Sequence, residues 1–339
     1  MPRQPLSIST APFLHAADTT PRIMWEVVYT LLPVWAAAVY YFGLSAILVS
    51  LAATAGCLIT EKWFAQESRN SLLDGSALIT GLLLGLTLPP GFPLWMAFLG
   101  GVVAIGMGKV IWGGLGQNVF NPALVGRAFL QAAFPTAITT WEAPSGQYWQ
   151  VRGTNLALPF YQGQPIDAVT AATPLSQMKF SHEPTAFVDL LLGNTSGSLG
   201  ETCGALILAA GVYLLARKII NWRIPAGMLG AVALFSGILY LIDPVSYPSP
   251  WFMLFAGGLL LGAVYMATDL VTSPLTPRGL WIYSIGIGLL VVLIRVWGGL
   301  PEGVMYAILL MNAATPLIDR YVRPRIFGHG AKKSGAASK

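Results

Sequence analysis

Long apolar runs recur along the whole chain, and they limit what it can fold into. Only 10% of the 339 residues are charged, against roughly 25% in soluble domains, so the chain has too few charges to cover a water-exposed surface. Inside a bilayer no water satisfies the backbone, and only helices or closed barrels can span it. The runs are continuous rather than alternating, so the sequence predicts an all-α polytopic membrane protein.

Ten apolar segments form two sets of five, separated by a mostly polar stretch at 137–201. The segments are expected at 23–42, 43–60, 72–88, 93–111, 119–136, 202–221, 225–243, 250–267, 279–297 and 301–319. They predict about ten transmembrane helices, with a first repeat at 23–136, a second at 202–319, and tails at 1–22 and 320–339. The first run is long enough to remain as a span, so no cleavable signal peptide is expected.

The basic residues predict the orientation, because Lys and Arg hold the cytoplasmic ends of spans. Ten spans place the following residues on one side: Lys62, Arg69, Arg217, Lys218, Arg223, Arg278, Arg320, Arg323, Arg325, Lys332 and Lys333. Both termini are then expected in the cytoplasm, and 137–201 on the outer side of the membrane. The net charge of +5 follows from this topology, so a nucleic-acid partner is not expected.

Two short sequences occur twice, in matching places of the two sets. WGGL stands at 112–115 and 297–300, and GLLLG at 81–85 and 258–262. Each set has five spans, so the two repeats are predicted to have opposite orientations. Inverted repeats usually form a site near the midplane where broken helices meet. Segments 72–88 and 250–267 are expected to be broken, because each contains glycine and ends in helix-breaking residues.

The stretch 167–175 reads DAVTAATPL. It closely resembles the flavinylation motif of the family that contains RnfD of Rnf electron-transport complexes and NqrB of the sodium-pumping NADH:quinone oxidoreductase. That motif is an Asp, two variable residues, Ser or Thr, a small residue, Ala and Thr, and Asp167, Thr170, Ala172 and Thr173 match it. The resemblance implies FMN joined through a phosphoester to the Thr173 hydroxyl by a dedicated flavin transferase.

The resemblance extends over nearly all the predicted spans. Further matching stretches are 74–78, 115–129, 197–202, 267–269, 272–274 and 301–304. The chain length favours the Rnf protein over the sodium-pump protein, which has a longer N-terminal extension. The resemblance implies a translocase complex that couples electron transfer between ferredoxin and NAD to sodium or proton movement. It also implies a second, non-covalent flavin (riboflavin) and, as partners, the A, B, C, E and G subunits of the Rnf complex.

The chain alone offers no metal site and no catalytic side chain. Cys57 and Cys203 lack metal-ligand spacing, and the three histidines are scattered, so neither a metal site nor a disulfide is expected. A flavin carries its own redox chemistry, while the protein sets its position and potential. We therefore expect the NAD, ferredoxin and iron–sulfur functions to belong to partner subunits.

Charged residues inside or beside apolar segments are functional candidates, because an unpaired charge at membrane depth is costly. They are Asp74, Lys109, Arg127, Glu201, Asp269, Arg295 and Glu302. Lys109 and Arg295 have an alternative explanation, since long basic side chains near helix ends can extend to the membrane surface. Arg127 has three possible roles: it could contact a flavin, a phosphate or an acidic partner. Gly200 and Glu201 lie in a turn before a helix, which suits either the FMN phosphate or a simple N-cap.

A second function class fits part of the pattern. Inverted repeats with broken helices are also typical of secondary transporters and channels. The stretch 167–173 separates the two classes, because a transporter without a redox role has no need of a flavin attachment site.

Overall fold

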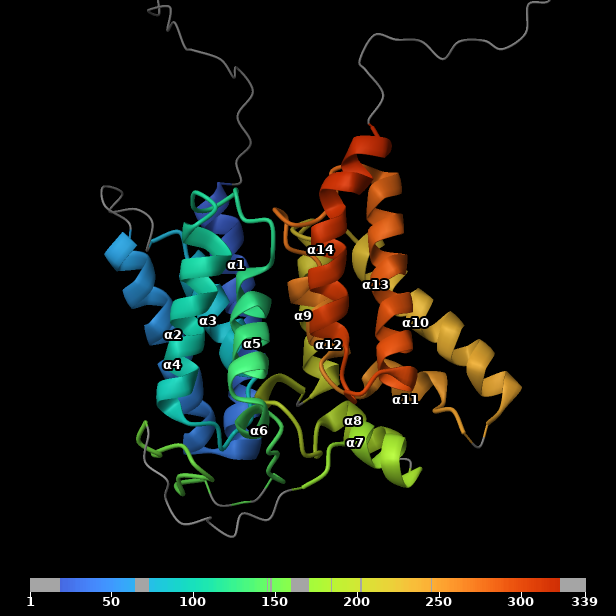
Figure 1. Ribbon diagram of the computed structural model, residues 1–339, viewed down its shortest axis with the longest axis horizontal. Helices are drawn as coiled ribbons and strands as arrows, with labels where there is room; N and C mark the ends of the chain where they lie inside the picture. Colours follow the sequence, from blue (N-terminus) through green and yellow to red (C-terminus); the bar gives the residue numbers. More distant parts are fainter. Residues whose placement is uncertain are drawn as a thin grey trace, which may run out of the picture.

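Helices make up the regular secondary structure in the part of the chain that the computed structural model describes: residues 19–64, 73–144, 146, 148–159, 171–183, 185–201, 203–244 and 246–323 (Figure 1). The first half contains α1 (Thr20–Phe42), α2 (Leu44–Phe64), α3 (Ser76–Leu86), α4 (Leu94–Ile105), the π-helical turn η1 (Gly106–Val110), α5 (Pro122–Ala133) and α6 (Pro135–Ile138). The connecting part contains α7 (Pro174–Ser176), η2 (Gln177–Ser181), α8 (Phe187–Leu192) and η3 (Leu199–Glu201). The second half contains α9 (Gly204–Ala216), α10 (Arg223–Ile242), α11 (Pro250–Phe255), α12 (Leu259–Leu261), η4 (Gly262–Met266), α13 (Pro277–Trp297) and α14 (Val304–Tyr321).

The long apolar helices have the dimensions of membrane spans. Among the described residues, α1, α2, α10 and α13 are long and apolar enough to cross a bilayer, and three shorter apolar helices accompany them at Ser76–Leu86, Leu94–Val110 and Gly204–Ala216. A helix needs about 20 apolar residues to cross the hydrocarbon core. The predicted helical, multi-pass membrane class is confirmed at this level.

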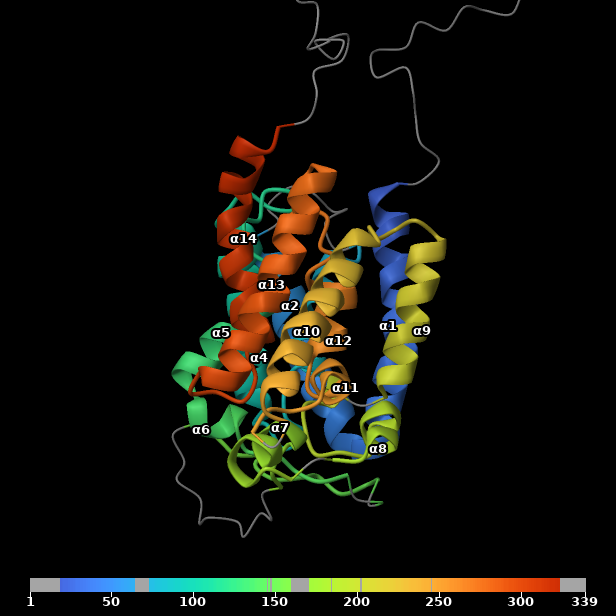
Figure 2. The same cartoon turned by 90° about the vertical axis from the view of Figure 1, so that its right-hand side faces the viewer.

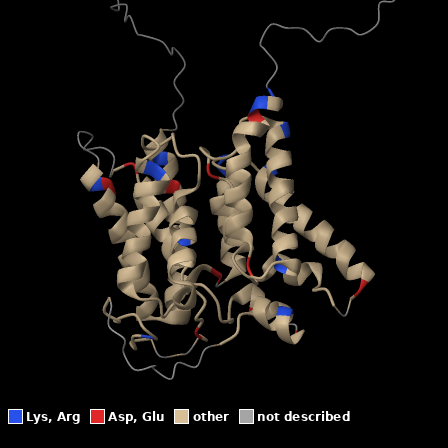
Figure 3. Ribbon diagram, viewed as in Figure 1, with Lys and Arg blue, Asp and Glu red and all other residues tan. Residues whose placement is uncertain are grey.

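Two helical bundles stand side by side in Figures 1 and 2. One contains α1 to α6 and the other α9 to α14; contacts between α1 and α9 and between α5 and α14 join them. The start of α1 and the end of α14 lie at one end of the molecule, whereas α6, α7 and α8 lie at the other (Figure 1). Many of the charged residues gather at the end where α1 starts, and a few lie between the ends (Figure 3).

Small residues bring α2 and α4 into close contact. A Cβ atom added to Gly56 would collide with the Phe98 carbonyl oxygen, and one added to Gly101 would collide with the Ala53 carbonyl oxygen. Lipid gives little hydrophobic force between helices, so membrane helices gain association energy from such close backbone approach. These two glycines therefore set the spacing of α2 and α4.

The segment 250–267 is interrupted, as expected, but inside the segment rather than at its end. Helix α11 ends at Phe255, Ala256 is extended, and Gly257 has φ +68°. Helix α12 begins at Leu259 and continues into η4. The positive φ needs glycine, so the break falls at the pair Gly257–Gly258.

Candidate functional site

Thr173 begins a short helix at the end of the molecule opposite the start of α1. Its Oγ1 atom accepts a hydrogen bond of 3.2 Å from the Ser176 backbone N–H, which makes Thr173 the N-cap of α7. The Ser176 hydroxyl lies 2.9 Å from the same oxygen. Only 6% of Thr173 is exposed, so its hydroxyl is both ordered and buried. Asp167 and Thr170, which belong to the same motif, lie outside the described residues.

The backbone beside Thr173 is tied to two neighbouring loops. The Ala171 N–H donates to the Trp141 carbonyl at 2.9 Å. The Ser196 hydroxyl donates to the Ala172 carbonyl at 2.5 Å. The residues just before Thr173 therefore have a defined path, although Ala172 itself is exposed.

Lys179 anchors the residues that follow Thr173 to the turn between α13 and α14. Its ammonium group donates to the carbonyl oxygens of Arg295 (3.0 Å), Gly298 (2.5 Å) and Leu300 (3.2 Å). These bonds complement the negative end of α13. Burial lowers the pKa of the Lys179 ammonium below its ordinary range. We call this group of contacts the Lys179 anchor.

A cavity of about 390 Å³ opens beside Thr173. Its size falls within the roughly 300–1,000 Å³ of small-molecule sites. Ala171, Ala172 and Ser176 line it from the Thr173 segment, and Arg127 and Glu302 supply its charged groups. The remaining lining residues are Gln131, Ile138, Thr139, Trp141, Phe180, Leu300, Pro301, Met305 and Tyr306. Two of the residues singled out in the sequence, Ala172 and Arg127, thus share one cavity next to Thr173.

Arg127 pairs with an acidic partner, which was one of the three explanations for it. Its Nη2 atom lies 3.0 Å from Oε2 of Glu302, and both side chains are largely buried. The other carboxylate oxygen of Glu302 accepts the Gly258 N–H at 2.7 Å. Glu302 therefore joins α5 of the first half to the start of α12 in the second.

Arg295 occupies the other side of the break between α11 and α12. Its guanidinium group donates to the carbonyls of Met253 (2.6 Å) and Ala256 (2.9 Å), and it is 4% exposed. A cation is stabilised by the partial negative charge at a helix C-terminus, and an anion by the partial positive charge at a helix N-terminus. The alternative that Arg295 extends to the membrane surface is therefore wrong: it binds the carbonyls at the end of α11.

Gly200 and Glu201 do not line the cavity beside Thr173. A Cβ atom on Gly200 would lie 2.9 Å from both the Leu86 oxygen and the Leu261 Cδ2 atom, so the glycine lets the two halves meet. The Glu201 carboxylate accepts a hydrogen bond from the Ser198 hydroxyl at 2.8 Å. Helix α9 begins three residues later and has Cys203 at its N-cap position, without a side-chain cap.

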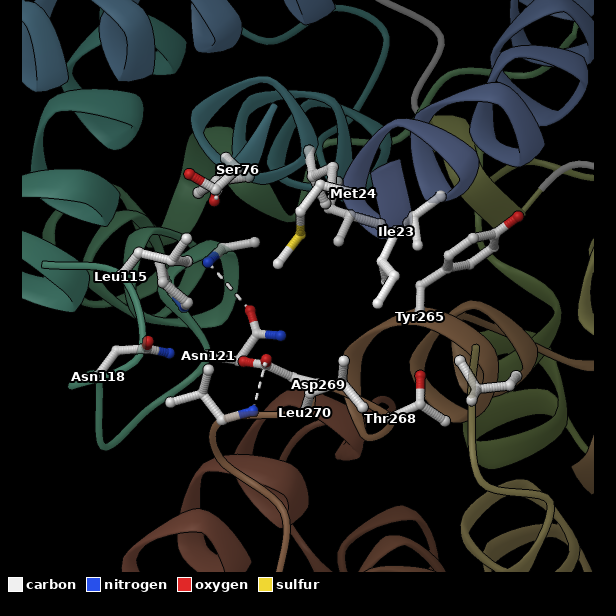
Figure 4. A pocket seen from close by; sticks show the side chains of 18 of the residues that line it. Ile23, Met24, Ser76, Leu115, Asn118, Asn121, Tyr265, Thr268, Asp269 and Leu270 are labelled. Atoms are coloured by element: carbon white, nitrogen blue, oxygen red, sulfur yellow. Dashed lines mark hydrogen bonds between the residues drawn. The ribbon is translucent and has the colours of Figure 1, made fainter. Parts of the chain in front are cut away.

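A second cavity, of about 110 Å³, lies between the two halves near the end where α1 starts (Figure 4). Asn121 and Asp269 lie side by side on one wall, and Ile23 and Met24 of α1 enter from another side. Ser76, Asn118 and Thr268 add polar groups. Polar side chains from the segment 72–88, from the start of 119–136 and from the residues just after 250–267 thus meet here.

Lys109 also lines this second cavity, and its surroundings contradict the surface explanation. Its Nζ atom lies 2.6 Å from Oε1 of Glu61 and 2.7 Å from the Ser76 hydroxyl. That hydroxyl in turn lies 2.7 Å from Asp74. Lys109 is 5% exposed, so it is a buried ion-paired residue rather than a side chain that reaches the membrane surface.

Several residues of these sites were not predicted, among them Glu61, Lys179 and Ser176. Glu61 follows the apolar segment 43–60 and precedes Lys62, a position typical of a polar helix end. Lys179 lies in the polar stretch 137–201, and Ser176 follows the motif without belonging to it. The partners of Glu61 and Lys179 are distant in sequence, and no local pattern indicates such pairs.

Comparison with known proteins identifies the family. The sequence model of the NQR2, RnfD, RnfE family matches residues 7–328. The chain belongs to this family. A relative from Clostridium ljungdahlii, the D subunit of a proton-translocating ferredoxin:NAD(+) oxidoreductase complex, is 39% identical over 95% of this chain and 96% of its own. The D subunit of the ion-translocating oxidoreductase complex of Stutzerimonas stutzeri is 43% identical over 92% and 93%. That of Alcanivorax borkumensis is 38% identical over 97% and 99%.

Proposed function

We propose that this chain is the D subunit of an Rnf-type ion-translocating ferredoxin:NAD oxidoreductase. The family match over nearly the whole chain supports this, as do the names of relatives at 38–43% identity. Such a subunit acts as part of a translocase and has no turnover alone. The A, B, C, E and G subunits are the expected partners, and they supply the NAD, ferredoxin and iron–sulfur chemistry.

In the proposed function the Thr173 hydroxyl carries FMN through a phosphoester. The observation that carries the proposal is the cavity of about 390 Å³ beside this threonine, because a tethered flavin ring needs such a space. The side chains present fit the group: small alanines stand next to the attachment point, and the Arg127 guanidinium faces the same cavity. When bound, the flavin supplies one-electron chemistry.

The residues of this chain orient the flavin and set its electrostatic surroundings. Phe180, Met305 and Tyr306 give the cavity apolar or aromatic walls that exclude water from a bound ring. Arg127 is held in place by Glu302, so that a positive and a negative group both lie in fixed positions. Such fixed charges favour one charge state of a bound cofactor over another.

The proposed topology has ten spans in two inverted repeats, with both termini cytoplasmic and the Thr173 side periplasmic. The start of α1 and the end of α14 at one end of the molecule support it. The WGGL repeats support it as well: the first follows η1 at the end where α1 starts, and the second follows α13 at the end that holds α7. The membrane is the bacterial inner membrane.

The second cavity (Figure 4) is the proposed place for the non-covalent riboflavin. Its Asn118, Asn121 and Asp269 side chains offer donors and acceptors to a flavin ring. At about 110 Å³ the cavity is smaller than known ligand sites, which start near roughly 300 Å³. Apolar side chains such as Leu115 would therefore have to move when the ring binds.

Flavin fluorescence on a denaturing gel tests the function. A yellow fluorescent band is expected for the wild-type chain made in cells that contain the flavin transferase, because a covalent flavin survives denaturation. Thr173→Val should abolish the band, while Thr173→Ser keeps an acceptor hydroxyl. Thr140→Val alters an exposed threonine on the same side that does not line the cavity, and it should keep the band. A wild-type band without flavin would favour the secondary transporter or channel, which the interrupted helix α11–α12 also suits.

A further inference from the structure

The hydroxyl that accepts the flavin is shielded in the folded chain. Thr173 is 6% exposed, and its Oγ1 atom faces the backbone N–H and the hydroxyl of Ser176. Pro174 and Leu175, which follow it, are buried as well. A modifying enzyme that approaches this conformation from solvent therefore has little access to the Thr173 hydroxyl.

The transfer reaction requires open space around that oxygen. The Thr173 Oγ1 atom must attack the FMN phosphorus of a flavin dinucleotide, forming a P–O bond while the P–O–P bond to the nucleotide breaks. The nucleoside monophosphate leaves with the electron pair, and the threonine proton passes to a base of the transferase. Attacking and leaving oxygens lie roughly in line in phosphoryl transfer, so the bulky pyrophosphate must lie directly against Oγ1.

Besides the hydrogen bonds at Ala171 and Ala172, two contacts hold the segment in its shielded position. Leu175 packs in a small apolar cluster with Leu190, Phe252 and Ala256. The Lys179 anchor fixes the segment to three carbonyls at the end of α13 and the turn after it. Hydrogen bonds from a charged donor are the stronger kind, so the anchor stabilises the docked segment.

We propose that FMN is transferred to Thr173 only while the segment 171–183 is detached from the bundle, and that Lys179 closes it again afterwards. The proposal rests on the proposed function of Thr173. It assigns Lys179 a positioning role in the assembled protein: it seats the flavin attachment point beside the cavity of Arg127 and Glu302. It also makes detachment of the segment the step that limits modification of a folded chain.

The rate of flavin attachment tests the proposal. The complex is assembled in cells without the transferase, and its membranes are then given transferase, flavin adenine dinucleotide and Mg²⁺. In-gel fluorescence should rise at least about tenfold faster for Lys179→Met, because the docked state loses charge-assisted hydrogen bonds. Lys179→Arg, which keeps the charge, and Lys62→Met, at an exposed lysine of α2, should behave like wild type. Equal rates of labelling for wild type and Lys179→Met would overturn the proposal.

A measurement without the transferase separates this inference from the proposed function. Thr173→Cys in a Cys203→Ser background leaves Cys57, which is buried, as the other thiol. A maleimide reagent should label Cys at this position slowly, and at least about tenfold faster when Lys179→Met is added. Fast labelling with Lys179 present would show that the site is open and end the inference. A wild-type chain that carries no flavin in cells with transferase would instead refute the proposed function, and the inference with it.

Discussion

At the residue scale, three buried basic side chains bind to acidic or carbonyl groups of the same chain. Lys109 meets Glu61, Arg127 meets Glu302, and Arg295 meets two carbonyl oxygens. The sequence indicated that these charges need partners or a function, but it did not indicate which residues the partners are. Glu61 and Lys109 are 48 residues apart, and Arg127 and Glu302 are 175 apart, so that no helical period or motif relates the members of a pair.

The Lys109–Glu61 pair should show the energetics of a buried ion pair. Replacing one partner, as in Lys109→Met or Glu61→Gln, leaves a buried charge without its counterion and should destabilise the protein by roughly 3–5 kcal/mol. The double variant Lys109→Met/Glu61→Gln should cost clearly less than the sum of the two. Thermal unfolding of the four proteins in one detergent measures this coupling, and additive losses would contradict the ion pair. Lys62→Met serves as the surface control.

Glu142 gives a pH prediction on the loop side of the molecule. Burial raises the pKa of this carboxyl above its ordinary value of 4.5, and its Oε1 atom lies against Gly91 and Gly153. A raised pKa means that the folded state holds the proton more tightly, so the stabilisation is present below pH 4.5 and lost as the pH rises through the folded pKa. The thermal midpoint of wild type relative to Glu142→Gln should therefore fall as the pH rises. A difference that is constant with pH would count against it.

At the element scale, the break between α11 and α12 depends on backbone conformation as much as on charge. Gly257 has φ +68°. Arg295 donates hydrogen bonds to carbonyl oxygens before it, and Glu302 accepts one from the N–H group after it. The sequence predicted an interrupted segment from its glycines and breakers. The position of the break inside the segment was not predictable, because it requires Arg295 and Glu302 from a distant part of the chain to satisfy the exposed helix ends.

Gly257→Ala should disturb this break and the Thr173 segment together. A Cβ atom at this position would lie 2.6 Å from Leu175 Cδ1, and a left-handed conformation costs a non-glycine residue roughly 1–2 kcal/mol. We expect a lower thermal midpoint and faster maleimide labelling of Thr173→Cys, since Leu175 would be displaced. Gly237→Ala in α10 meets only Pro250 Cγ at 3.6 Å and is the matched control. Unchanged labelling would show that Leu175 does not transmit the change.

At the scale of the whole molecule, the chain's class was predictable and its sites were predictable only in part. Apolar runs and sparse charge are sufficient for a helical membrane protein, because the bilayer leaves few alternatives. Motif resemblance led to Thr173 and Ala172, and Arg127 was found from its cost at membrane depth. The cavity that brings them together could not be predicted, because it is formed by α5, the α7 segment and the start of α14, and the sequence does not show how these pack.

The position of Arg127 and Glu302 between the halves leads to the sharpest test of the proposed flavin site. Both side chains line the cavity beside Thr173, so a flavin reduced there by one electron would gain negative charge near a fixed cation and a fixed anion. Arg127→Gln removes the cation and should lower the one-electron potential of the bound FMN, whereas Glu302→Gln removes the anion and should raise it. A change of about 60 mV corresponds to about 1.4 kcal/mol for one electron. Both variants lose the same ion pair and should destabilise the fold similarly, so general damage would move the two potentials in the same direction. Redox titration of the assembled complex distinguishes these outcomes, with Arg127→Lys as the charge-conserving control. Shifts of equal sign would show that Arg127 and Glu302 do not lie next to the flavin.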